Sequence, residues 1–371
     1  MAESYPLTAP VSTLYPDERI NRLLRPYRSD RLTSTARIRA IIRLDRVFDG
    51  VVVNMTRPAI RLADVNKLFG STHAVRDLDL EVPVGSLCGF LGPNGAGKTT
   101  TIRMIMSIIY ADSGSIEVLG GNALKSKDRI GYLPEERGLY RKMRVGEFLE
   151  YLAKLKGMRR RDLSTYIQQW LDRIDLPDVY RKKCEELSKG MQQKVQFLAA
   201  ILHEPELLIL DEPFSGLDPV NTELLNQLIR ELQEQGTTII FSTHVLHQAE
   251  LICDRIFLIN KGVKILDATL QEIQQRFDPR TIVVEPVDGE VLSDRIAGVQ
   301  AVRRMPHSAA FELELENSAD PQVIMQRILS QRPMRSVELR RLSLDEVFIQ
   351  VVQKDVGLDA AELAREELSH V

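Results

Sequence analysis

The segment GPNGAGKT, from Gly92 to Thr99, has residue types and a spacing that suit phosphate binding. It matches the pattern GxxxxGK[ST] and lies between an expected strand, LCGFL (87–91), and an expected helix, TTTIRMIMSII (99–109). Glycines allow backbone N–H groups to turn toward phosphate oxygens, and a helix N-terminus adds positive potential. We expect Lys98 to reach the β- and γ-phosphates and the Thr99 hydroxyl to coordinate Mg²⁺. The segment predicts a nucleoside triphosphate site, a feature that GTPases, kinases and motors share.

Two acidic residues, Asp211 and Glu212, end the apolar run LLIL (207–210). A carboxylate at the end of a buried strand suits the Mg²⁺ shell, and the glutamate beside it can orient and deprotonate an attacking water. The alternative is that both residues only cap a turn. The phosphate-binding segment favours the chemical interpretation.

A histidine, His244, follows a third apolar run, TTIIF (237–241). A lone histidine is more often structural, but this one ends a strand, where ligands of open α/β sheets bind. Two further motifs flank Asp211 in the sequence, LSKGMQQK (187–194) before it and SGLD (215–218) after it.

The elements that must position these residues alternate between strand and helix patterns. The short apolar runs are typical of strands buried on both faces, and AIRLADV (59–65) alternates like a strand. This order predicts an α/β fold with a mainly parallel sheet. Between Val145 and Leu187 the pattern becomes helical, with segments at 146–158, 164–176 and 179–187, which indicates a helical subdomain inserted into the α/β core.

The chain is expected to divide into four parts, with a boundary at Asp278–Pro279. They are an Arg-rich, poorly ordered extension (1–57), a nucleotide-binding domain (58–278) whose helical subdomain spans about 136–190, an α+β accessory domain (279–353) and an acidic tail (354–371). In the accessory domain we expect strands at 281–285, 301–305, 310–315 and 336–341, and helices at 290–299, 321–331 and 343–352. The extension is a solvated tail, an arm for nucleic acid or anionic lipid, or a segment before a natural start at Met55; these alternatives stay open.

Composition excludes several classes of protein. The 371 residues have globular composition and a net charge of −3, so no global basic field indicates nucleic acid. Three separated cysteines without a CxxC motif fit a reducing cytosol better than a disulfide scaffold or a zinc site. No run approaches 18 apolar residues, and no secretory signal opens the chain, so we expect neither a membrane span nor a secreted precursor.

Taken in order, these motifs resemble the nucleotide-binding domain of ATP-binding cassette (ABC) proteins over residues 58–278. The resemblance implies a P-loop NTPase fold that binds ATP and Mg²⁺. It also implies that two copies pair head to tail, with each ATP held between the phosphate loop of one copy and the signature of the other.

The resemblance assigns expected roles residue by residue. Glu212 and His244 are the catalytic pair, Asp218 lies at the dimer seam, and the aromatic ring of Phe69 stacks on adenine, unless Phe69 is a core residue. The signature acting in trans is Leu187, Ser188, Lys189, Gly190 and Met191. The expected Mg²⁺ ligands are Thr99, Asp211 and Glu135. The remaining ATP-binding residues are Gly92, Pro93, Asn94, Gly95, Ala96, Gly97, Lys98, Thr99, Thr100 and Glu135.

Two departures from the family pattern indicate a subgroup within the ABC family. Glu135 stands where the family usually has glutamine, and the signature reads LSKGM in place of LSGGQ, with Lys189 and Met191. Both departures, and the closing segment SLDEVFIQVV (343–352), resemble the single-domain ATPases that serve exporters of the sodium-extrusion and ABC-2 type. A carboxylate at Glu135 can still ligate Mg²⁺.

The sequence therefore predicts the ATP-hydrolysing subunit of an ABC-type exporter, most simply a homodimer that drives an integral membrane permease on a separate chain. Its expected location is cytoplasmic, peripheral on the inner face of the cell membrane, with no nucleic acid as partner. The main alternative is a soluble ABC ATPase that acts on ribosomes or nucleic acid. A kinase does not explain LSKGM, SGLD and His244 together. The transported substrate stays open.

Overall fold

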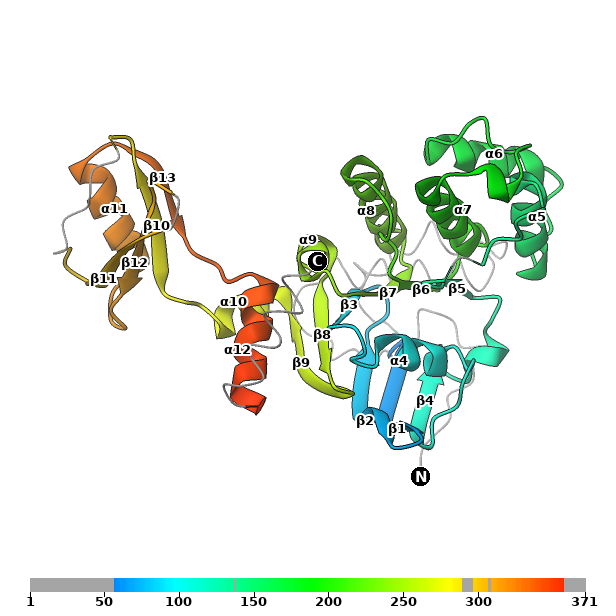
Figure 1. Ribbon diagram of the computed structural model, residues 1–371, viewed down its shortest axis with the longest axis horizontal. Helices are drawn as coiled ribbons and strands as arrows, with labels where there is room; N and C mark the ends of the chain where they lie inside the picture. The colour runs from blue at the N-terminus through cyan, green and yellow to red at the C-terminus, as the bar shows by residue number, and fades with distance from the viewer. Residues whose placement is uncertain (1–56, 137, 289–295, 306–307, 357–371) are drawn as a thin grey trace, which may run out of the picture. The chain divides into compact units, whose positions relative to one another are not determined.

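The computed structural model describes residues 57–356 except 137, 289–295 and 306–307. The expected extension (1–57) and acidic tail (354–371) lie almost wholly outside these residues, and most of the expected helix at 290–299 does too. The described chain holds three sheets and the helices that cover them (Figure 1).

The central sheet has six strands in the order β5-β6-β7-β3-β8-β9. Its first five strands pair in parallel, and β9 closes the edge antiparallel to β8. Their bounds are β3 (Leu87–Leu91), β5 (Ile130–Leu133), β6 (Leu207–Asp211), β7 (Thr238–Thr243), β8 (Arg255–Asn260) and β9 (Val263–Thr269). A mainly parallel sheet is thus confirmed, and its strands include the predicted apolar runs.

Successive residues of these strands supply two different cores. In β6, Leu208 and Leu210 pack into one cluster with the helices that follow β5, whereas Leu207 and Ile209 pack into a second cluster with β1, β2 and α4. A strand with period two that is covered on both faces must be apolar throughout, which explains the unbroken run LLIL.

A separate antiparallel sheet supplies the second cluster. It has the order β2-β1-β4, with β1 (Ile60–Phe69), β2 (Thr72–Val82) and β4 (Ser113–Val118). The strand predicted at 59–65 belongs here, so it is not part of the parallel sheet. Helix α4 (Lys98–Ile105) lies between the two sheets and buries Ile102, Met104 and Ile105.

The helices that cover the other face include α5 (Val145–Leu155), α6 (Leu163–Arg173) and α7 (Lys189–Ile201), which pack against one another (Figure 1). Helices α8 (Pro219–Glu234) and α9 (Leu246–Ile252) follow β6 and β7, and two short 3₁₀ turns lie at Ala123–Lys125 and Cys184–Glu186. The inserted helical subdomain is present.

The helix predicted over 179–187 is wrong, because only the turn Cys184–Glu186 is helical there. The extended segment before it uses its backbone to cap α5: the carbonyls of Lys182 and Tyr180 accept hydrogen bonds from the first two N–H groups of α5, each at 2.9 Å. The first N–H groups of any helix lack partners within the helix, and satisfying them here outweighs the local helical pattern.

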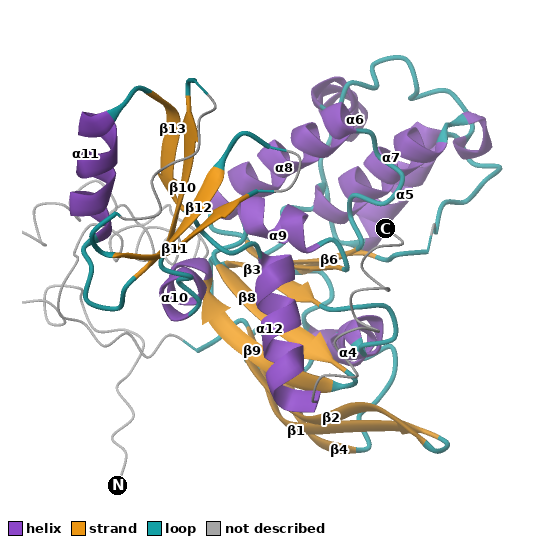
Figure 2. Ribbon diagram, turned by 60° about the vertical axis from the view of Figure 1, so that its left-hand side comes forward, coloured by secondary structure: helices purple, strands orange, loops and turns teal. Residues whose placement is uncertain are grey.

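The C-terminal region forms a four-stranded antiparallel sheet, β11-β12-β10-β13, with one covering helix (Figure 2). Its elements are β10 (Thr281–Pro286), β11 (Val299–Arg304), β12 (Phe311–Leu315), α11 (Pro321–Gln331) and β13 (Met334–Leu339). It has its own core, which includes Ile282, Phe311 and Ile328. Helix α10 (Leu270–Arg276) precedes this unit and α12 (Leu344–Val356) follows it.

Candidate nucleotide site

The phosphate loop connects β3 to α4, and its glycines are required by the backbone. Gly92, Gly95 and Gly97 all have positive φ, at 152°, 77° and 105°. A Cβ atom on Gly92 would lie 2.1 Å from the carbonyl oxygen of Ile259, and one on Gly97 would lie 2.4 Å from that of Ala74. Neither of these two positions can hold a side chain, so both glycines are part of the fold as well as of the site.

The turn between β8 and β9 holds the loop in place. The Gly262 N–H donates to the carbonyl oxygen of Ala96 at 2.9 Å, and the Gly262 carbonyl accepts from the Arg76 N–H at 2.8 Å. The phosphate loop is therefore bonded to the β8–β9 turn, and the same turn is bonded to strand β2 of the antiparallel sheet. Its anion-binding shape is fixed by the fold.

The Lys98 side chain folds back over the loop. Its Nζ donates to the carbonyl oxygens of Gly92 at 2.7 Å and Pro93 at 3.1 Å. Burial lowers the pKa of Lys98, and the nearby carboxylates of Glu212, Asp211 and Glu135 oppose that shift. The ammonium thus rests on neutral acceptors that a phosphate oxygen can replace.

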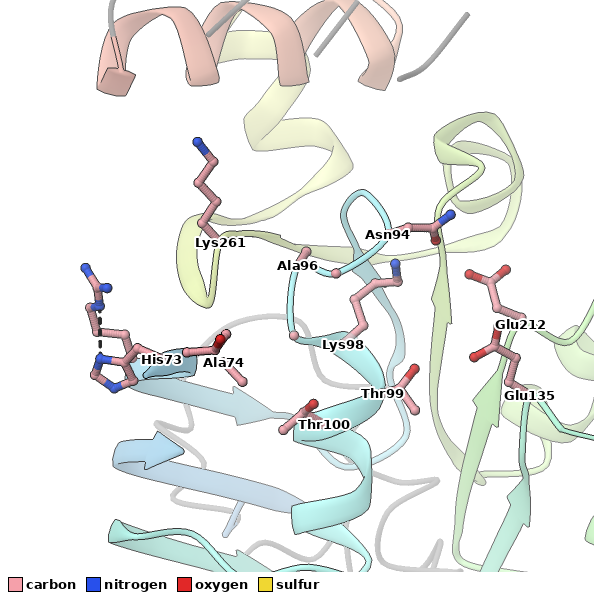
Figure 3. A pocket seen from close by; sticks show the side chains of 14 residues that line it. His73, Ala74, Asn94, Ala96, Lys98, Thr99, Thr100, Glu135, Glu212 and Lys261 are labelled. Atoms are coloured by element: carbon pink, nitrogen blue, oxygen red, sulfur yellow. Dashed lines mark hydrogen bonds between the residues drawn. The ribbon is translucent and has the colours of Figure 1, made fainter. Parts of the chain in front are cut away.

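A cavity of about 630 Å³ opens around the loop (Figure 3). The loop and two of the predicted carboxylates line it, namely Asn94, Gly95, Ala96, Gly97, Lys98, Thr99, Thr100, Glu135 and Glu212. In Figure 3 the carboxylates of Glu135 and Glu212 lie on one side of the loop, and His73 lies on the other. A triphosphate in this cavity would meet the acidic groups at one end.

Five lining residues were not predicted from the sequence: Thr72, His73, Ala74, Arg76 and Lys261. The first four lie on β2 shortly after Phe69, and the fifth lies in the β8–β9 turn. The four β2 residues could have been found from the sequence because they closely follow Phe69, the residue expected to stack on adenine. No local sequence pattern marks Lys261. Phe69 itself is 51% exposed at the end of β1, with the Lys67 ammonium 5.4 Å from its ring centroid, and it is not among the lining residues.

Asp211 ends β6 with a buried carboxylate. Its Oδ1 accepts a hydrogen bond from the Ser242 hydroxyl, whereas its Oδ2 is buried without a hydrogen-bond partner among the described residues. Burial raises the pKa of Asp211, and the hydrogen bond from Ser242 and the nearby Thr99 hydroxyl partly offset that rise. A buried carboxylate oxygen without a partner, beside the Thr99 hydroxyl, has the chemistry of a Mg²⁺ site.

Glu212 is the next residue, and its backbone is strained. It has a φ of +50°, which is uncommon for a residue with a side chain and concentrates at functional sites. Its Oε1 accepts from the His244 N–H at 3.1 Å and lies 2.8 Å from the His244 Nδ1, while its Oε2 accepts from the Thr243 hydroxyl at 3.2 Å. The ends of β6 and β7 thus bring Glu212 and His244 together.

The predicted signature lies elsewhere on the chain. Ser188 caps α7 by accepting from the Met191 N–H at 3.2 Å, Leu187 is buried, and Lys189 and Ser188 are exposed. None of residues 187–191 lines the cavity, and neither does Asp218, which caps α8 through the Asn221 N–H at 2.9 Å. One chain does not bring these residues to its own phosphate loop.

Gln193 connects the signature helix to the catalytic strand end, and the sequence did not single it out. This buried side chain donates to the carbonyl oxygen of Pro213 at 3.0 Å. It therefore fixes α7 against the residues that follow Glu212. A glutamine on a helix carries no sequence signal for this contact, which depends on tertiary packing.

The comparisons with known proteins agree with this geometry. Two family models match: ABC transporter over residues 75–215, and the C-terminal domain of DrrA1-3-like ATP-binding proteins over residues 269–352. The uncharacterized ABC transporter ATP-binding protein YhaQ of Bacillus subtilis is 41% identical over 78% of this chain and 96% of its own length. The linearmycin resistance ATP-binding protein LnrL of the same organism is 29% identical over 77% of this chain and 94% of its own.

A solved structure of an ATP-binding subunit of an ABC transporter is also similar. It is 30% identical, with a TM-score of 0.56, and the match covers 59% of this chain and 93% of that one. Within the part of the chain that the structure describes, no helix is long and apolar enough to cross a membrane.

Proposed function

This chain belongs to the ATP-binding subunits of ABC transporters, which hydrolyse ATP to power transport, and from that premise we propose that it drives an exporter whose permease is a separate chain. The observation that carries the ATPase part of the proposal is the meeting of Lys98, Asp211, Glu212 and His244 at one edge of the sheet. The name of the relative LnrL supports export, because removing a toxic compound is one way for a transport ATPase to give resistance. We further propose that the protein lies at the inner face of the cell membrane.

In the proposed mechanism, the groups of the site divide between phosphate binding and activation of the attacking water. The phosphate-loop N–H groups and Lys98 bind the β- and γ-phosphates, with Lys98 exchanging the carbonyls of Gly92 and Pro93 for phosphate oxygens. Thr99, Asp211 and Glu135 would provide oxygen ligands for Mg²⁺, and the bound ion would neutralise charge on the phosphates. Glu212 accepts a proton from the attacking water, and His244 orients Glu212 and contacts the γ-phosphate.

We propose that two copies pair head to tail around ATP. The support is the location of residues 187–191: they hold an exposed serine hydroxyl at a helix N-terminus, yet they lie outside the cavity of their own chain. A second copy would bring Ser188 and Gly190 to the γ-phosphate, with Asp218 at the seam. Hydrolysis would then release the two copies from one another.

The permease is proposed to contact the helical subdomain. Exposed apolar side chains gather there: Tyr140 is 53%, Tyr151 44% and Leu155 62% exposed, and the rings of Tyr140 and Tyr151 lie 6.1 Å apart. Exposed apolar patches of this kind mark interaction surfaces. A crosslinkable residue at Tyr151 should capture the permease; capture only through residues 281–353 would contradict this assignment.

The test of the function is a pull-down with the Glu212→Gln variant, which should keep ATP bound. Tagged protein is incubated with ATP and with detergent-solubilised membranes or the soluble fraction, and the bound partners are identified. Recovery of a multi-span membrane protein supports the transporter assignment. Recovery of ribosomes or nucleic acid without a membrane protein would instead favour the soluble ATPase.

A further inference from the structure

Helix α12 leaves the C-terminal sheet and packs on the nucleotide-binding domain. Its buried side chains are Leu344, Val347, Phe348 and Val352, at the helical spacing i, i+3, i+4, i+8. They belong to the same core cluster as Ala249 and Ile252 of α9 and Leu266 of β9. Both ribbon views place α12 beside β9 (Figures 1 and 2).

Polar contacts fix the N-terminal end of α12 against α9. The Leu344 N–H donates to Oε2 of Glu250 at 3.5 Å, so a residue of α9 accepts from one of the free N–H groups of α12. Burial raises the pKa of Asp345, and His247 of α9 partly offsets that rise, which puts the two side chains within electrostatic reach.

The same end of α12 is bonded to the C-terminal sheet. Arg340 donates to Glu346 of α12 and to Glu312 of β12, each at 2.5 Å, and Ser343 and Glu346 cap the helix reciprocally. Contacts therefore run without a break from β12 through Arg340 and α12 to α9. A displacement of the C-terminal sheet could therefore be transmitted to α9 through these contacts.

The two elements under α12 each lie next in sequence to a residue that contacts the nucleotide site. Helix α9 begins at Leu246, two residues after His244, which contacts Glu212. Strand β9 begins at the turn whose Gly262 is bonded to Ala96 of the phosphate loop. Removing the support of α12 would free α9 first, since α9 is a helix of only seven residues.

We propose that α12 is a positioning element for hydrolysis: by holding α9 through Phe348 and Glu250, it keeps His244 against Glu212. ATP binding depends on the phosphate loop, whose supporting turn at Gly262 is also bonded to Arg76 of β2, so α12 acts on turnover more than on affinity. The inference rests on the roles proposed above for His244 and Glu212. Phe348 and Glu250 touch no nucleotide and act through His244.

The test is whether variants at the contact between α12 and α9 still lower ATP hydrolysis when His244 is replaced by alanine. The variants are Phe348→Leu and Glu250→Gln, each made alone and with His244→Ala; the matched control is Gln350→Ala, on the exposed face of α12. Each purified full-length protein is assayed for ATP affinity, for hydrolysis of γ-labelled ATP and for melting temperature. Phe348→Leu keeps an apolar side chain so that the protein still folds, and Glu250→Gln leaves the core unchanged.

We expect Phe348→Leu and Glu250→Gln to lower kcat about fivefold, with ATP affinity and the Gln350→Ala control unchanged within about twofold. Combined with His244→Ala, they should lower kcat by less than about twofold further, because the group they position is absent. A merely structural role predicts the same loss in both backgrounds, and that result would overturn the inference alone, as would normal kcat in the single variants. Normal turnover of His244→Ala by itself would contradict the role proposed for His244 and the inference with it.

Discussion

The phosphate loop and the signature segment each place a glycine at a helix N-terminus, yet the fold constrains the two glycines differently. At Gly97 a Cβ atom would lie 2.4 Å from a backbone oxygen, whereas at Gly190 its nearest neighbours would be at 3.5 Å, which is ordinary contact. The loop is bonded to the β8–β9 turn, whereas Ser188 of the signature is bonded to Met191 of its own helix. The fold needs the glycine of the loop, but it does not need Gly190.

This difference indicates where each region finds its ligand. The phosphate loop is complete within one chain, because its cavity, its lysine and its acidic groups are all together. The space around Gly190 is less crowded, which agrees with the proposal that a second copy approaches this segment. The predictions below separate ATP binding by one chain from the proposed hydrolysis by two copies.

The largest effect is expected for Glu212→Gln. Amide oxygens cannot accept the proton of the attacking water, so hydrolysis should fall by about 10²–10⁴, the usual contribution of a general base. ATP affinity should stay within about threefold, because the phosphate loop is unchanged. Steady-state turnover within about twofold of the unchanged protein would show that Glu212 is not the base.

Lys98→Ala should act on binding itself. Removing a buried ammonium that contacts phosphate should weaken ATP affinity about 30-fold or more, as expected for a loss of about 2 kcal/mol. Lys261→Ala is the matched control, because Lys261 is an exposed lysine that lines the same cavity. Equilibrium binding of a fluorescent ATP analogue measures both; equal affinities for the two variants would refute the role given to Lys98.

The two glycines give the sharpest contrast within the comparison. Gly190→Ala should lower hydrolysis about tenfold, with ATP affinity and melting temperature unchanged, because the added methyl group is accommodated in one chain but faces the ATP of the other. Gly97→Ala should lower both ATP affinity and melting temperature, since its Cβ has no room. If Gly190→Ala destabilises the protein as Gly97→Ala does, the proposed difference between the two regions is wrong.

The smallest expected effect is the change in stability of the Asp211→Asn variant when neither nucleotide nor metal is bound. Burial raises its pKa, so the charged carboxylate costs stability above that pKa, and stability increases as the pH falls through it. In EDTA at pH 7, Asp211→Asn should therefore raise the melting temperature by about 2–4 °C, the shift for about 1 kcal/mol in a domain of 150–250 residues. With ATP and Mg²⁺ the order should reverse, because only the unchanged protein gains from the metal. A lower melting temperature for Asp211→Asn in EDTA would contradict this account of the carboxylate.

Much of the site could be predicted because its residues follow strand ends or occupy one continuous loop. The runs before Gly92, Asp211 and His244 are apolar, and that pattern alone places their ends at one edge of a parallel sheet. The fold class follows from the same strands, since each must be covered on both faces.

The features that sequence reasoning missed depend on tertiary contacts. Segment 179–187 has a helical pattern, but its backbone caps α5. Gln193 reaches the carbonyl of Pro213, and Lys261 enters the cavity through a turn between two strands. The packing of α12 on α9 joins residues about 100 positions apart, and no local pattern encodes such a pair.

The central claim is that ATP is enclosed by two copies of this chain, and light scattering of the Glu212→Gln variant tests it most directly. The chain has a mass of 42.1 kDa. The account predicts a species of twice that mass with ATP and Mg²⁺, a single chain without nucleotide, and a single chain when Lys98→Ala is added. A single chain in the presence of saturating ATP and Mg²⁺ would contradict the account.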